Sequence, residues 1–192
     1  YLLSRYTFPG KALLSGLTHL PLILPPVVTG YALLLLFGRN GPVGSLLEPM
    51  GIVFAFDWTG AALAAAVMGF PLLVRAARLS FDMVDPRIER AAETLGARPV
   101  IRFLTITLPL ALPGVVAGAV LAFAKALGEF GATLFIARPD RPTLPIAIYR
   151  LLGLPGAANF AQAMALSTVL LLLTAVAVLL IERVRGTGPS PF

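Results

Sequence analysis

Long apolar segments alternate with short polar segments along the 192-residue chain. At ~1.5 Å per residue, the apolar segments reach the length of a helix that crosses a hydrocarbon core, the second of them when residues 75–79 extend it. Their approximate limits are Leu13–Phe37, Trp58–Val74, Leu108–Ala137 and Phe160–Ile181. The pattern predicts an all-α membrane protein with about four transmembrane helices, forming a single domain over residues 1–192.

The first and third apolar segments are expected to be irregular. Pro21, Pro25 and Pro26 should kink the first segment or break its first half, because proline cannot donate to the helical ladder. The third segment would be ~45 Å long if fully helical, which exceeds the thickness of a hydrocarbon core. A bend near Gly128 and Gly131 would absorb the excess.

The second apolar segment is rich in small residues, which are almost continuous from Ala61 to Met68. Small residues let helices approach closely in lipid, so this helix is expected to pack inside the bundle. Trp58, at its start, fits an interfacial anchor. The preceding stretch, Val43–Phe56, is too short for a span and is expected to be re-entrant or interfacial.

Composition supports the membrane assignment and narrows the function. The chain is 58% hydrophobic and 12% charged, about half the charged share of a soluble domain. The net charge of +6 does not indicate a nucleic-acid partner, because the basic residues stand at the ends of apolar runs. The lack of cysteine excludes disulfides and thiolate metal sites, and His19 is the sole histidine. No phosphate-binding loop or catalytic motif is present, so we expect neither catalysis nor a cofactor in this chain.

The distribution of basic residues predicts the orientation. With four spans, both termini and the charged stretch at about 80–107 lie on one side. That side carries ten Lys or Arg residues, and the opposite side carries four. The positive-inside rule therefore places this loop and both termini in the cytoplasm.

The charged loop contains signals for one short helix. Asp85-Pro86 is typical of a helix start, and Gly96 is typical of a helix stop. Between them, one face carries small apolar residues at helical spacing: Ile88, Ala91, Ala92 and Leu95. An isolated helix of this length is marginal in water, so the stripe needs a partner. The periodicity leaves two alternatives open, docking onto another subunit or folding back onto the chain's own bundle.

The same loop resembles a known motif. It reads Glu89-Arg90-Ala91-Ala92, then three residues and Gly96, then nine residues and Ile106-Thr107-Leu108-Pro109. This is similar to the EAA motif of binding-protein-dependent ABC importer permeases, where the loop forms a coupling helix that sits in a cleft of the ATPase subunit. The resemblance implies that the coupling residues are Glu89, Ala91, Ala92 and Gly96.

Three further segments resemble the molybdate branch of that family, with the sulfate/thiosulfate permeases as near neighbours. They are Leu24–Gly30, Phe37–Pro42 and Ala126–Thr133. The resemblance implies a type I permease fold and an importer for a tetrahedral oxyanion such as molybdate or tungstate. It also implies a homodimer in the bacterial inner membrane, two cytosolic ATPase subunits that bind ATP and Mg, and an external oxyanion-binding protein. The family usually has one more helix before residue 1, so a truncated chain lacking the first family helix is expected.

Four polar residues at membrane depth are candidates for the translocation pathway. Lys125 and Glu129 stand at i, i+4, so they form either an ion pair that orients the helix or a pathway position. Thr29 and Thr133 could line a pore or bond to their own backbone. A rival function from another class is a secondary transporter or channel with Lys125 and Glu129 as an ion relay, although the sequence shows no convincing internal repeat.

Overall fold

A computed structural model describes residues 1–186 of the chain, and the described residues contain helices and loops without any β-strand. Three helical stretches are long and apolar enough to cross a membrane: Trp58–Asp82, Pro99–Leu127 and Ala157–Leu180. The helices in chain order are α1 (Leu2–Arg5), α2 (Lys11–Ile23), α3 (Pro26–Phe37), α4 (Gly44–Leu47), η1 (Glu48–Met50), α5 (Trp58–Asp82), α6 (Pro86–Thr94), α7 (Pro99–Arg102), η2 (Phe103–Thr107), α8 (Leu108–Leu127), α9 (Thr133–Ile136), α10 (Leu144–Leu152) and α11 (Ala157–Gly186).

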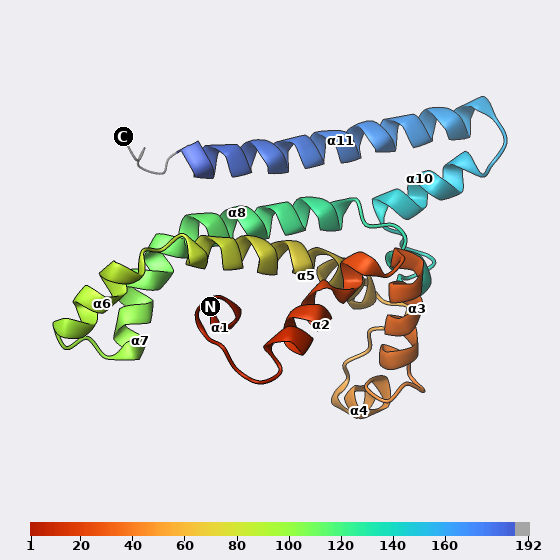
Figure 1. The fold of residues 1–192 in the computed structure, drawn as a ribbon. Helices are drawn as coiled ribbons and strands as arrows, with labels where there is room; N and C mark the ends of the chain where they lie inside the picture. Colours follow the sequence, from red (N-terminus) through yellow and green to blue (C-terminus); the bar gives the residue numbers. More distant parts are fainter. Residues whose placement is uncertain (187–192) are drawn as a thin grey trace.

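Helices α5 and α8 form the centre of the bundle, and α11 lies alongside α8 (Figure 1). Small residues let α5 and α8 approach closely: a Cβ added to Gly69 would lie 2.9 Å from the carbonyl oxygen of Ala122. The hydroxyl of Ser80 adds a hydrogen bond of 2.6 Å to the carbonyl of Ala111 across the same interface. Ala64 is fully buried, as the run of small residues predicts.

The first apolar segment is broken. The chain bends by 115° between α2 and α3, so the described chain has three candidate spans, or up to four if this bent pair counts as one. The break falls where two prolines follow each other, and Pro26 opens α3 at a position where its missing N–H costs nothing. The prolines thus produce the predicted break, at the middle of the segment and more sharply than a kink.

The third apolar segment also bends where the sequence predicted. Helix α8 ends at Leu127, and the chain turns through residues 128–132 into the short helix α9. Its start lies further upstream than expected, because α7, η2 and α8 run on as one helical stretch. Within it, η2 is a π-helical turn in which the Leu108 N–H bonds to the carbonyl of Phe103. Pro109 follows and offers no N–H, which explains why the regular ladder is disturbed there.

The two ends of the bundle differ in character (Figure 1). One end carries α6 and α7, and the other carries α9, α10 and the turn before α5. At that second end, the Phe56 N–H donates to the carbonyl of Ile136 at 2.9 Å, and Arg138 lies 3.8 Å from Asp57. Arg138 also donates a 2.7 Å hydrogen bond that lowers the pKa of Asp140. The stretch 43–56 forms α4, η1 and a turn at this end rather than a span.

Candidate coupling helix and translocation pathway

Helix α6 has the ends that the sequence predicted. The side chain of Asp85 accepts a 2.8 Å hydrogen bond from the Arg87 N–H, which satisfies one free donor of the first turn. Gly96 adopts φ +84, and two backbone bonds of 3.0 Å close the other end, from Ala97 to Ala92 and from Gly96 to Glu93. This pairing is the Schellman arrangement, which needs a left-handed residue and therefore favours glycine. The helix ends at Thr94, with Leu95 as its C-cap directly before Gly96.

The predicted apolar stripe of α6 is divided between two environments. Ala92 is buried against the bundle, whereas Ala91 is exposed and the side chains of Ile88 and Leu95 are 45% and 88% exposed. The helix therefore folds back onto its own chain along one face and presents another face to the surroundings. Of the four residues assigned to coupling by resemblance, Ala91 and Gly96 lie at the surface, and Ala92 and Glu89 face inwards.

Glu89 makes its polar contacts within the chain. Its Oε1 accepts a 2.7 Å hydrogen bond from the hydroxyl of Thr107, which is fully buried in η2. Its Oε2 lies 3.8 Å from Nε of Arg5. Glu93, on the neighbouring surface, is 66% exposed and pairs with Arg102 at 2.8 Å. The two glutamates therefore tie α6 to the helical stretch that contains Arg102 and Thr107, Glu89 on the buried face and Glu93 on the exposed face.

Sequence reasoning missed Arg5 and Thr107 as members of this site. Thr107 occupies the unspecified position of the Ile106-x-Leu108-Pro109 pattern, so the motif pointed to the segment without singling out the hydroxyl. Arg5 is 84 residues away from Glu89 in the chain (89 minus 5), and no local pattern links them. Only folding brings the side chain of Arg5, at the end of α1, to Glu89 on α6.

The second candidate group lies near the bend after α8. Lys125 and Glu129 form an ion pair of 2.7 Å, in which the Glu129 side chain is 2% exposed and that of Lys125 is 42% exposed. The other oxygen of Glu129 accepts a 3.0 Å hydrogen bond from the Ala132 N–H. Glu129 therefore holds the turn that leads into α9, while Lys125 extends towards the exterior of the chain.

Thr29 and Thr133 are both buried, and both hydroxyls bond to backbone. Thr133 donates to the carbonyl of Glu129 at 2.9 Å, and Thr29 donates to that of Pro25 at 3.5 Å. Their segments meet, because a Cβ added to Gly30 would lie only 2.3 Å from the carbonyl oxygen of Ala132. The break in the first span and the bend in the third therefore form one packed unit.

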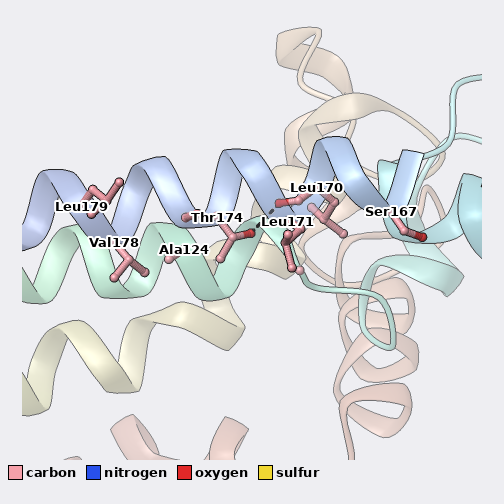
Figure 2. Close-up of a pocket in the computed structure, with 9 residues that line it drawn as sticks. Ala124, Ser167, Leu170, Leu171, Thr174, Val178 and Leu179 are labelled. Atoms are coloured by element: carbon pink, nitrogen blue, oxygen red, sulfur yellow. Dashed lines mark hydrogen bonds between the residues drawn. The ribbon is translucent and has the colours of Figure 1, made fainter. Parts of the chain in front are cut away.

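A groove of about 720 Å³ runs between α8 and α11 (Figure 2), and its lining includes Ala124 and Gly128, which precede Lys125 and Glu129 in the chain. Its polar lining groups are the hydroxyls of Ser167 and Thr174, which donate to the carbonyls of Ala163 and Leu170 on their own helix. The groove is consequently apolar in effect. The pathway candidates Lys125 and Glu129 do not line it.

The sequence matches a known family, described as the binding-protein-dependent transport system inner membrane component, over residues 2–186. The chain belongs to this family. It is 57% identical over 160 residues to the molybdenum transport system permease protein ModB of Escherichia coli, covering 81% of this chain and 70% of that protein. It is 53% identical over 161 residues to the protein of the same name from Haemophilus influenzae, covering 82% and 70%. It is also 41% identical over 137 residues to the sulfate transport system permease protein CysT of Salmonella typhimurium, covering 71% and 50%.

Membership confirms the fold class predicted from the sequence, an all-α membrane protein of the type I permease family. It also confirms the resemblance to importer permeases and the expectation of a non-catalytic transport subunit. In the part of the chain that the structure describes, no group of three or more His, Asp or Glu side chains is placed to hold a metal ion.

Gly96 offers a direct test of the α6 geometry. A Cβ at this position meets no atom within 4 Å, so Gly96→Val acts through the left-handed backbone alone, at a cost of about 1–2 kcal/mol. We expect the end of α6 to fray, and the amount of substrate transported per ATP hydrolysed to fall. Gly51→Val is the matched control, because Gly51 has φ +76 with equally open surroundings at the other end of the bundle. Equal transport yields in the two variants would contradict a role for α6.

Proposed function

We propose that this chain is the membrane-spanning permease subunit of an ATP-driven importer for molybdate in the bacterial inner membrane. The observation that carries the proposal is the 57% identity to a molybdenum transport permease over most of the chain. The lower identity to the sulfate permease, over a smaller share of both proteins, favours molybdate over sulfate.

The proposed assembly contains two copies of the permease, two cytosolic ATPase subunits and an external binding protein for the oxyanion. The excess of basic residues at the α6 end supports placing this end and both termini in the cytoplasm. Residues 187–192 of the C-terminus lie outside the described part of the chain. The ATPase subunits would bind ATP and Mg, and this chain would supply the docking helix and the pathway.

The docking surface on α6 is proposed to be its exposed face. Ile88, Ala91 and Leu95 expose apolar surface, and Asp85 and Gly96 hold both helix ends. A short apolar helix of this kind suits a hydrophobic groove on a partner protein. When ATP binding closes the ATPase pair, the two coupling helices would approach each other, and the bundle would switch from inward-facing to outward-facing.

The pathway is proposed to pass the packed unit formed by the α2–α3 break and the bend after α8. Thr29, Lys125, Glu129 and Thr133 all belong to these two segments. Half-exposed Lys125 offers a positive charge to a passing anion, and its partner Glu129 keeps that attraction moderate. Substrate selectivity would then rest mainly on the external binding protein.

Reconstitution tests the proposed function. The full chain, its partner ATPase and the binding protein of the same system are placed in proteoliposomes with radioactive molybdate outside and ATP inside. We expect uptake that requires ATP and the ATPase, persists with a protonophore, and is weakly inhibited by excess sulfate. Uptake driven by a proton gradient without the ATPase would instead indicate a secondary transporter, and preferred uptake of sulfate would reassign the substrate.

Cysteine cross-linking tests the docking face. The chain contains no cysteine, so a single introduced cysteine is its sole thiol. We expect Ala91→Cys and Leu95→Cys to cross-link efficiently to the ATPase subunit through a reagent whose maleimide takes this thiol and whose succinimidyl ester takes a lysine amine of the ATPase. Ala92→Cys, on the buried face, should react far less, and Phe123→Cys on an exposed part of α8 should give no ATPase product. A strong product from Ala92→Cys alone would contradict the assigned face.

A further inference from the structure

We infer that Glu89 acts inside the permease, as a positioning residue that links α6 to the base of α8, instead of contacting the ATPase. The inference rests on the proposed function, because it assumes that α6 receives the movement of the ATPase. Glu89 lies one position after the exposed Ile88, yet its side chain is only 12% exposed. Its carboxylate is directed away from the docking face, towards the buried hydroxyl of Thr107.

The partners of the Glu89 carboxylate lie within the chain. Arg5 has a buried Nε without a hydrogen-bond partner, and this atom faces the carboxylate at 3.8 Å. The same guanidinium donates through Nη2 to the carbonyl of Val84, at the joint between α5 and α6. A carboxylate that is 12% exposed, bonded to a buried hydroxyl and faced by a guanidinium presents little surface to a partner protein.

The position of Thr107 connects α6 to the start of α8. Thr107 closes the π-helical turn η2 and is followed at once by Leu108, the first residue of α8. At the far end of α8 stand Lys125 and Glu129, the pathway candidates. A displacement of α6 would therefore reach the pathway through one short hydrogen bond and one continuous helix. The irregular turn is a point where α8 can pivot, because its helical ladder is already interrupted.

A double-mutant cycle tests this link in the assembled transporter. Thr107→Val keeps the shape of the side chain and removes its hydroxyl, and Glu89→Ala removes the acceptor. Two quantities are measured: molybdate transported per ATP hydrolysed in proteoliposomes, and the affinity of the permease for its ATPase subunit. We expect each single variant to lower the transport yield about tenfold, and the double variant to be no worse than either, because both remove the same hydrogen bond. The affinity for the ATPase should stay unchanged.

Two further variants keep the test decisive. Thr105→Val is the matched control, since Thr105 is an exposed threonine of the same turn whose hydroxyl bonds only to the carbonyl of Ile101. It should leave both quantities unaltered. Glu89→Gln preserves an acceptor for Thr107 and should therefore keep more of the transport yield than Glu89→Ala. If the alanine variant does not fold, Glu89→Met, which also lacks the acceptor, replaces it in the cycle.

Two outcomes of the cycle would overturn the inference. If Glu89→Ala weakens ATPase binding about tenfold while Thr107→Val changes nothing, Glu89 contacts the ATPase and the inference is overturned. Additive losses of transport yield would also overturn it, because they would mean that the two residues act separately. A wild-type chain that binds the ATPase but imports no molybdate would count against the proposed function instead.

Discussion

Replacing Lys125 by methionine should lower the stability of the permease by about 3 kcal/mol. The substitution leaves the carboxylate of Glu129, which is 2% exposed, without its ion-pair partner. An unpaired buried charge costs several kcal/mol, and the partial exposure of Lys125 places the expected loss near the lower end of the usual range. The free energy of unfolding is measured by denaturant titration of the purified chain in detergent micelles.

The double variant Lys125→Met, Glu129→Gln separates the two roles left open for this pair. A neutral glutamine can still accept from the Ala132 N–H, so most of the lost stability should return. If transport returns as well, the pair serves to orient the helix. If stability returns and transport does not, the charges belong to the pathway. A Lys125→Met chain as stable as the wild type would contradict the burial of Glu129.

The substitution Gly30→Ala should be as damaging, with an expected loss of about 3 kcal/mol. The added Cβ would lie 2.3 Å from the carbonyl oxygen and 2.7 Å from the Cα of Ala132. Because these are backbone atoms, no side-chain rotation relieves the clash, and α3 must move away from α9. The break of the first span would separate from the bend of the third, which should reduce both thermal stability in detergent and transport.

Gly16→Ala is the matched control for this prediction. Gly16 lies within α2, and a Cβ there meets no atom within 4 Å. Alanine has a higher helix propensity than glycine, so this variant should be unchanged or more stable by about 0.5–1 kcal/mol. If the two glycine variants had the same melting temperature, the close contact between α3 and α9 would be wrong.

Features that depend on neighbouring residues were predictable. The start of α6 follows from a capping side chain beside a proline, and its end follows from a glycine with positive φ. The break at Pro25-Pro26 follows from the missing N–H groups, and the bend after α8 follows from a segment longer than the membrane is thick. Each of these signals depends on a few residues or on one helix length, so it can be recognised from a single sequence.

The docking motif shows the limit of such signals. Spacing and residue types predicted a coupling role for α6, and they led to a family that the comparisons confirm. The same spacing treated Glu89 and Ala91 alike, although one lies inside and the other outside. Helical periodicity predicts which residues share a face, but it does not say which of two moderately polar faces meets the bundle.

The sequence by itself determined the class of the protein, its long apolar segments, the helix ends in the loop and the motif from which we propose docking to an ATPase. Tertiary structure alone decided that Glu89 meets Thr107 and Arg5, and that the α2–α3 break rests on the turn after α8. The physical reason is the range of the forces. Caps, proline breaks and hydrophobic length act locally, whereas buried polar pairs form between residues distant in sequence and depend on how whole helices pack.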